Sequence, residues 1–268
     1  MSQRITRRDL ERIRHQLSDR SWSTLEHLAA YRFSTTKQIA RLHQEHHTTP
    51  ISAQRQTSRL LQHLHSLGLV KHLSRRIGGQ RAGSSGYIWH VTEAGYRLLA
   101  LQAGNHQQTR HRTNEPSSAF LEHTLAIAEV WVRINEISRT SPLIIHASES
   151  EPLCWRRHLG PHGQIEWLKP DLAVTTRLQG YEYHWWFEID LGTENPKRIR
   201  AKTNVYLRHF HDGQQQRTRG VFPAVLWITA TRQRRDQLVA TLSAQQNDLP
   251  GMFTVCQIDQ LPDVLLAP

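Results

Sequence analysis

Two strand-forming runs joined by a turn dipeptide constrain the fold of this chain more than any other feature. They lie in residues 169–190, KPDLAVTTRLQGYEYHWWFEID, and Gln179 and Gly180 separate them. Such a dipeptide is typical of a two-residue hairpin turn. With those residues as the turn, Asp171 lies directly opposite Glu188. Because side chains alternate between the faces of a strand, Glu188 and Asp190 share the face that carries Asp171.

These three carboxylates need a compensating charge. Like charges opposed in a sheet are destabilising, and the aromatic run before Glu188 predicts apolar surroundings. A divalent cation would remove that cost, and carboxylate oxygens suit Mg²⁺ or Mn²⁺ better than zinc. In this interpretation Asp171 and Glu188 are metal ligands. Asp190 either binds the metal or supports a ligand.

A lysine near such a cluster would favour phosphodiester cleavage, which needs a polarised phosphate, an activated water and stabilisation of developing negative charge. Lys202 lies on the next expected helix, 196–210, on the same side as Ile199 and Tyr206, and can reach the cluster from there. A salt bridge that neutralises Glu188 is the alternative. Tyr206 is a conceivable nucleophile, but core packing is the favoured interpretation.

The amphipathic helix 119–137 offers a further candidate acid. Glu122 and Glu129 stand on one polar face of this helix, and either is a candidate metal ligand. A solvated helix face is the favoured interpretation for both. His123 is interpreted as a packing or hydrogen-bonding residue.

The positive charge of the chain is concentrated in its first part. Residues 1–118 contain 18 Lys and Arg against 7 Asp and Glu, whereas residues 119–268 contain 16 of each, so the net charge of +11 belongs to the first part. This asymmetry points to a polyanionic partner there. A soluble basic domain without such a partner is the alternative.

At 268 residues and 38% hydrophobic content, the chain is long enough for two domains. Helical and strand patterns predict a charged N-terminal arm over 1–21, a winged helix-turn-helix over 22–103, a polar linker over 104–118 and a second domain over 119–268. Expected strands of the second domain include 143–146, 151–156, 224–229 and 252–258. The overall fold class is α+β or α/β.

A winged helix places its third helix, here about 52–67, in the major groove of double-stranded DNA. Arginine and glutamine side chains suit base edges, and wing arginines suit phosphates or the minor groove. A winged helix that binds protein is the alternative. The candidate DNA contacts are Gln54, Arg55, Thr57, Ser58 and Arg59 on the helix and Arg75, Arg76 and Arg81 on the wing.

Cysteine content and hydropathy predict a cytoplasmic protein. Cys154 and Cys256 are the only cysteines, and the 18 histidines lack the spacing of a zinc finger. No apolar run approaches a membrane span and no signal peptide is recognisable, so no membrane partner is expected. A homodimer is compatible with a winged helix, but the sequence shows no interface.

The motifs PD at 170–171, FEIDLGTE at 187–194 and K-x-x-x-Y at 202–206 resemble a restriction-endonuclease-like PD-(D/E)xK core whose lysine has moved to the following helix. Coupled to a winged helix, they resemble the replication-relaxation family, which is similar to MobC-type relaxases of conjugative plasmid mobilisation. The resemblance covers about residues 22–258. It implies binding near an origin of transfer or replication, metal-dependent nicking, nucleoid or plasmid association, and transfer or replication proteins as partners. Asp190 departs from the pattern, because it occupies the usual lysine position.

Two functions follow from the sequence. The first is an Mg²⁺- or Mn²⁺-dependent DNA nickase, with Asp171, Glu188, Asp190 and Lys202 as catalytic residues. The second is a non-catalytic DNA-binding replication accessory or regulator with an inactive nuclease-like domain. The departure at Asp190 favours the second, and the combination of Asp171, Glu188 and Lys202 favours the first.

Overall fold

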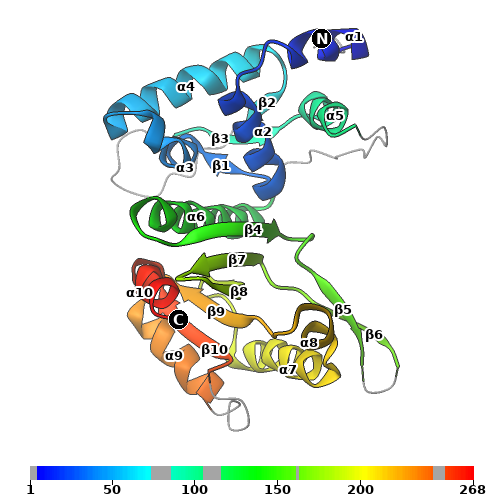
Figure 1. Ribbon diagram of the computed structural model, residues 1–268, viewed down its shortest axis with the longest axis vertical. Helices are drawn as coiled ribbons and strands as arrows, with labels where there is room; N and C mark the ends of the chain where they lie inside the picture. Colours follow the sequence, from blue (N-terminus) through cyan, green and yellow to red (C-terminus); the bar gives the residue numbers. More distant parts are fainter. Residues whose placement is uncertain (1–4, 74–85, 105–115, 161–162, 244–250) are drawn as a thin grey trace. The chain divides into compact units, whose positions relative to one another are not determined.

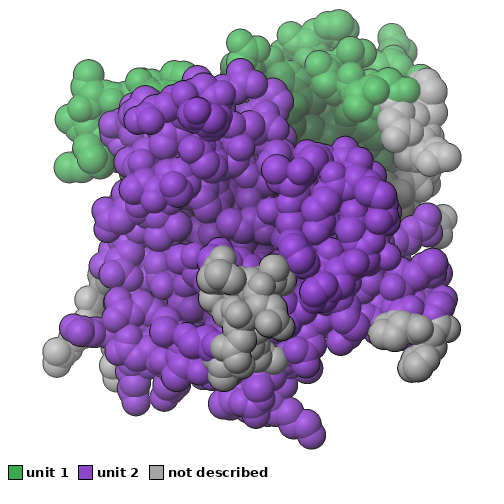
Figure 2. Space-filling model, turned by 60° about the horizontal axis from the view of Figure 1, so that its bottom comes forward, with its two compact units in different colours: residues 1–132 green, residues 133–268 purple. Residues whose placement is uncertain are grey.

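The computed structural model describes residues 5–73, 86–104, 116–160, 163–243 and 251–268. The chain forms two compact units, residues 1–132 and residues 133–268, which Figure 2 shows in different colours. One long helix, α6 (Ser118–Thr140), contributes residues to both units. Each unit is described separately below.

Unit 1 combines helices with a small antiparallel sheet in the order β1-β3-β2 (Figure 1). The order of elements along the chain is two helices, a short strand, two further α-helices separated by a 3₁₀ helix, two strands and a closing helix. The elements before α6 are α1 (Arg7–Arg14), α2 (Asp19–Tyr31), β1 (Ser34–Thr35), α3 (Thr36–Leu42), the 3₁₀ helix η1 (Gln44–His46), α4 (Pro50–Ser66), β2 (Val70–His72), β3 (Ile88–Val91) and α5 (Glu93–Gln102).

Local sequence signals set the helix ends of unit 1. The Thr35 hydroxyl accepts a hydrogen bond from the Gln38 amide, and the Gln38 side chain accepts one from the Thr35 amide, which together form a capping box at the start of α3. After α4, Gly68 adopts a φ of 71°, the left-handed conformation that favours glycine. The core includes Leu10 and Ile13 of α1, so the segment expected as a charged arm contains a helix packed on this unit.

Unit 2 is built on a five-stranded mixed sheet in the order β10-β9-β8-β7-β4, with a separate two-stranded ribbon, β5-β6. Helices connect the parallel strands. Its elements after α6 are β4 (Ile144–Ser150), β5 (Arg156–Leu159), β6 (Ile165–Leu168), β7 (Leu172–Leu178), β8 (Tyr181–Asp190), α7 (Pro196–Asp212), α8 (Gln214–Arg219), β9 (Ala224–Thr229), α9 (Arg232–Ser243), β10 (Phe253–Gln257), the 3₁₀ helix η2 (Ile258–Gln260) and α10 (Leu261–Leu266).

The direction of the strands explains the layering of unit 2. β4, β7 and β8 pair antiparallel, whereas β8, β9 and β10 pair parallel and therefore need crossovers, which α7 and α9 provide. Both helices pack on one face of the sheet, against Trp186, Val225 and Trp227. α7 begins as predicted: the Asn195 side chain accepts a hydrogen bond from the Arg198 amide at 2.9 Å, and Pro196 occupies the first turn.

The α+β class is confirmed, with one local correction in unit 2. The strand expected over 151–156 is wrong, because residues 151–154 form a turn and β5 begins at Arg156. Residues 147–150 belong instead to β4, which ends at Ser150, and Ser150 pairs with Leu172 of β7. No helix of the described residues is long and apolar enough to cross a membrane.

A buried histidine in unit 2 predicts acid sensitivity. Burial lowers the pKa of His209 to about 4, and His158 acts in the same direction. Since the unfolded residue has a pKa near 6.5, the unfolded chain binds the proton more readily between about pH 6.5 and pH 4. The free energy of unfolding therefore falls by about 1–3 kcal/mol as the pH decreases through that window.

Replacing His209 with phenylalanine should remove this contribution. Neither ring nitrogen of His209 has a hydrogen-bond partner among the described residues, so the substitution removes no hydrogen bond to them. Urea unfolding of wild type and His209→Phe, monitored at about pH 7.5 and pH 5, measures the difference. An equal loss of stability in both proteins on acidification would contradict the assignment to His209.

Candidate active site

The predicted register of the β7-β8 hairpin is confirmed. Leu172 pairs with Phe187, which places the preceding Asp171 level with Glu188. The Asp171 amide donates to the Phe187 carbonyl at 3.0 Å, and the Ile189 amide donates to the Asp171 carboxylate at 2.7 Å. The turn residues Gln179 and Gly180 both have positive φ, 51° and 87°, as a primed hairpin turn requires.

Glu188 is fully buried and is held by two residues of α7. The Lys202 ammonium forms an ion pair with one carboxylate oxygen, and the Tyr206 hydroxyl donates to the other. The two residues are four positions apart, so they lie on the same side of α7. The Lys202 ammonium also lies 5.6 Å from the centre of the Trp227 ring. Lys202 therefore reaches the carboxylates from α7, and its contact with Glu188 is the salt bridge that the sequence offered as the alternative.

Burial and neighbouring charges perturb both groups of this ion pair. Burial raises the pKa of Glu188 to about 8, Lys202 opposes the rise and Asp171 adds to it. Burial disfavours the charged form of Lys202, but the Glu188 and Asp171 carboxylates raise its pKa above the usual value. Two acidic groups and one cation therefore interact strongly on this face, and a further cation would favour the ionised form of Glu188.

Tyr206 is a core residue, as the favoured interpretation expected. Its side chain is fully buried, and it packs in the core beneath the sheet with Trp186. Burial and the Glu188 charge raise its pKa well above the usual value, so the hydroxyl keeps its proton. Tyr206 orients Glu188 rather than offering an exposed nucleophile.

Asp190 is engaged by a different cation. Its buried carboxylate accepts hydrogen bonds from Arg234 at 2.8 and 3.1 Å and from the Gly192 amide. Arg234 also donates to the Glu194 carbonyl at 2.6 Å, which ties α9 to the segment before α7. Through Arg234 and the Gly192 amide, the Asp190 carboxylate anchors the segment between β8 and α7.

Removing Arg234 should therefore destabilise unit 2. Arg234→Met leaves the Asp190 carboxylate buried without its cation and is expected to lower the free energy of unfolding by about 3 kcal/mol. The double variant Arg234→Met with Asp190→Asn should recover much of this loss, because no charge is then left unpaired. Urea unfolding measures both. Equal stabilities of the single and double variants would show that the ion pair is not the cause.

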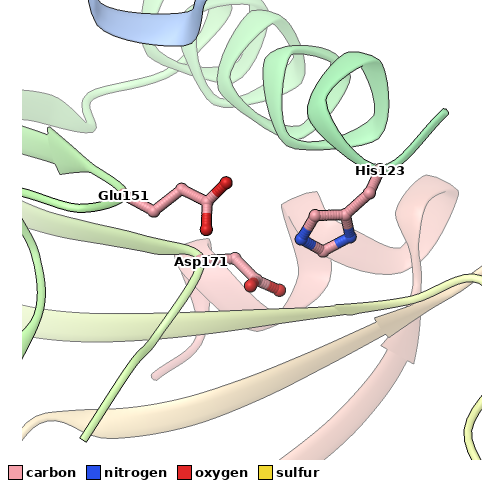
Figure 3. A group of neighbouring side chains, drawn as sticks. All are labelled: His123, Glu151 and Asp171. Carbon is pink, nitrogen blue, oxygen red and sulfur yellow. The ribbon is translucent and has the colours of Figure 1, made fainter. Parts of the chain in front are cut away.

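The structure places a carboxylate beside Asp171 that the sequence did not reveal. Glu151 follows the last residue of β4, and its amide donates to the Asp171 carbonyl at 3.2 Å. In the described part of the chain, carboxylate oxygens of Glu151 and Asp171 lie within 4.8 Å of each other (Figure 3). Both carboxylates belong to unit 2.

The two acidic residues expected from α6 have other environments. Glu122 is exposed. Glu129 accepts hydrogen bonds from Arg41 at 2.5 Å and from the Gln38 side chain at 3.1 Å, so it joins α6 to α3 within unit 1. This arrangement matches a structural role for Glu129. Glu151 is the acidic residue that adjoins Asp171.

Four of the predicted DNA contacts lie together on α4. Gln54, Arg55, Ser58 and Arg59 line a shallow depression of about 400 Å³. The prediction of Thr57 as a DNA contact is wrong, because its side chain is fully buried. Thr57 lies on the core side of the helix, four residues after Ala53 and four before Leu61. The predicted wing contacts Arg75, Arg76 and Arg81 lie outside the described residues.

These features define an α+β protein with a mixed five-stranded sheet, whose buried glutamate is paired with a lysine of α7 and has further carboxylates nearby. A family model described as replication-relaxation matches residues 25–225. The chain belongs to the replication-relaxation family, which confirms the family expected from its motifs and indicates a role in replication or relaxation. No curated protein and no solved structure matches the chain.

Proposed function

We propose that this protein binds double-stranded DNA at an origin of transfer or replication and nicks one strand in a metal-dependent reaction. The proposal is supported by the alignment of Asp171 with Glu188, the ion pair of Glu188 with Lys202 of α7, and Glu151 beside Asp171. The order of strands and helices in unit 2 resembles a PD-(D/E)xK core, and that of unit 1 resembles a winged helix.

The donor set fits a hard divalent cation. Glu151 and Asp171 offer carboxylate oxygens, the ligands that Mg²⁺ and Mn²⁺ prefer. When bound, the metal would polarise the scissile phosphate and activate a water molecule. Asp171 is held in place for this role by the Ile189 amide. Lys202, with 28% of its side chain exposed, supplies positive charge next to the carboxylates.

A second function is supported by a specific observation. The two other predicted site acids are neutralised by side chains, Glu188 by Lys202 and Asp190 by Arg234. A nuclease-like domain that keeps these pairs only for stability would make the protein a DNA-binding replication accessory or regulator without catalysis. Asp190 at the usual lysine position agrees with this alternative.

Relaxation of supercoiled DNA separates the two functions. The substrate is a plasmid that carries the origin of the protein's own element, incubated with Mg²⁺, with Mn²⁺ or with EDTA. A nickase is expected to yield the open circular form only with metal, and both Asp171→Ala and Lys202→Ala should lose this activity. A wild-type protein that binds the plasmid but leaves it supercoiled under every condition would refute the nickase.

The DNA-binding half of the proposal has a separate test on α4. Arg55→Ala is expected to weaken binding to the specific duplex by about 1–3 kcal/mol if the guanidinium reads a base edge. The matched control is Gln56→Ala, because Gln56 is exposed on the same helix but does not line the depression. Fluorescence anisotropy with specific and unrelated duplexes measures both affinities. Unchanged affinity and specificity in Arg55→Ala would remove this base contact.

A further inference from the structure

The ribbon β5-β6 has two chemically different faces. Strand pairing sets His158 opposite Glu166 and Arg157 opposite Trp167. The first pair faces α7: the Glu166 carboxylate accepts a hydrogen bond from Arg208 at 2.8 Å, and the His158 ring lies 4.7 Å from that of His209. Figure 1 shows the ribbon extending from the end of the main sheet alongside α8.

The opposite face of the ribbon is apolar and open. Leu159, Ile165 and Trp167 expose 64%, 61% and 51% of their surface. Alternation along two short strands puts these side chains on the same side as Arg157. Exposed apolar side chains gathered on one face mark a binding surface more often than scattered ones do. The ribbon therefore presents a free face whose chemistry is both aromatic and basic.

A small cavity adjoins this face. It has a volume of about 280 Å³ and is lined by Trp155, Arg156, Arg157 and Trp167 from the ribbon region and by Gln214 and Gln215 of α8. This volume is at the lower end of the roughly 300–1,000 Å³ typical of ligand pockets, so it suits one planar group. We call it the Trp155–Trp167 pocket. It offers two aromatic rings together with amide and guanidinium donors.

The charge around the Trp155–Trp167 pocket is positive, although residues 119–268 as a whole carry no net charge. The Lys169 ammonium lies 4.6 Å from the centre of the Trp155 ring. Arg157 is exposed and forms no ion pair with any residue that the structure describes. Arg156 and Arg217 are paired with Glu149 and Asp212, so among the described residues Lys169 and Arg157 supply the uncompensated positive charge. This local excess of cations favours a polyanion over an apolar partner.

Short hydrogen-bonded segments connect the pocket to the candidate metal ligands. Trp155 follows Glu151 by four residues, through a turn in which the Cys154 thiol donates to the Pro170 carbonyl at 2.9 Å. On the other side, Lys169 precedes Asp171 by two residues. A polynucleotide strand with a phosphate at the carboxylates would therefore have neighbouring nucleotides within reach of the pocket.

We propose that the Trp155–Trp167 pocket binds an unstacked base of a single-stranded DNA segment next to the strand that is cut. This inference rests on the proposed nicking function and names the substrate subsite of the same unit. Aromatic side chains stack on any base, and cations beside them contact the backbone, which is the combination that single-stranded nucleic acids require. The pocket would hold DNA locally opened at an origin, whereas α4 binds the intact duplex.

The test measures binding of the full-length protein to DNA in EDTA, so that no cleavage occurs. The probes are a fluorescently labelled single-stranded oligonucleotide of mixed sequence and the matching duplex. Trp167→Ala is expected to weaken single-strand binding by about 5- to 150-fold, the range for the loss of one stacked base, and to leave duplex binding unchanged. Arg157→Ala should weaken single-strand binding in the same direction.

The matched control is Tyr181→Ala. Tyr181 is an exposed aromatic residue of the same unit, 70% exposed at the hairpin turn, and it does not line the pocket. This variant should bind both probes as wild type does. Thermal unfolding checks that Trp167→Ala remains folded, as expected for a half-exposed side chain.

Three results would overturn the inference: unchanged single-strand affinity in Trp167→Ala, an equal loss for Tyr181→Ala, or an equal loss for both DNA probes. Self-association of wild type that is abolished by Leu159→Ser, with single-strand binding intact, would instead assign the face to a protein contact. The experiments distinguish failure of the pocket from failure of the nuclease. If wild type nicks DNA and Trp167→Ala binds single strands as wild type does, only the pocket is rejected. If wild type never nicks DNA and Trp167→Ala loses single-strand binding, only the nuclease is rejected.

Discussion

Replacing Asp171 with asparagine is expected to eliminate metal-dependent nicking while preserving the fold. The asparagine side chain keeps an oxygen that can accept the Ile189 amide hydrogen bond, which measures 2.7 Å in the native protein. It removes the negative charge that would hold the cation next to Glu151. A catalytic metal supplies several kcal/mol of stabilisation to the transition state, so its loss should reduce the rate by about a thousandfold or more.

Two measurements check this expectation. Conversion of supercoiled to open circular plasmid gives the rate, and calorimetric titration with Mn²⁺ gives the metal affinity, which should fall in parallel. Glu182→Gln is the matched control, because it removes a partly exposed carboxylate from the same hairpin, where its partners are Arg177 and His184. Nicking by Asp171→Asn at the wild-type rate would place the activity elsewhere.

Replacing Lys202 with methionine is expected to reduce both stability and activity, with a pH dependence that identifies the cause. The variant leaves the Glu188 carboxyl fully buried without its cation. Breaking a buried ion pair costs about 3–5 kcal/mol when the remaining charge persists. Glu188 avoids part of this cost by binding a proton, since burial raises its pKa to about 8 even with Lys202 present.

The sign of the pH effect follows from that shift. A carboxyl whose pKa is raised in the folded state destabilises the fold increasingly as the pH rises above the unfolded value, near 4.3. With Lys202 absent, the pKa of Glu188 rises further, so the difference in stability from wild type should be small near pH 6 and grow by about 1.4 kcal/mol for each pH unit above about 8. Urea unfolding at several pH values measures this difference.

The double variant Lys202→Met with Glu188→Gln separates structure from catalysis. It contains no buried unpaired charge and should recover stability at high pH. Nicking should remain absent, because neither the lysine nor the carboxylate is restored. Recovery of nicking together with stability would mean that the pair serves the fold only, whereas a pH-independent loss in Lys202→Met would contradict the buried ion pair as its origin.

Several features of this molecule were predictable because they depend on residues close in sequence. The Gln179-Gly180 turn determines which residues of β7 and β8 face each other, and the cap residues determine where α3 and α7 begin. The helical spacing of Lys202 and Tyr206 placed both on the side of α7 that meets Glu188. Each of these inferences spans one turn, one hairpin or one helix.

Other features depended on which distant segments become neighbours. Arg234 lies 44 residues after Asp190 and reaches it because α9 crosses back over the sheet. Glu151 adjoins Asp171 because β4 pairs with β7, a choice that the strand patterns do not specify. The helical pattern of the sequence pointed instead to Glu122 and Glu129 of α6 as candidate acids.

By itself, the sequence determined the family, the α+β class and the alignment of Asp171 with Glu188, because motif order, strand alternation and turn chemistry are local. The tertiary structure decided which charge neutralises which carboxylate: Lys202 pairs with Glu188 and Arg234 with Asp190. These pairings matter for stability because both carboxylates are buried. A buried carboxylate without a cation or hydrogen-bond donor beside it would destabilise the fold.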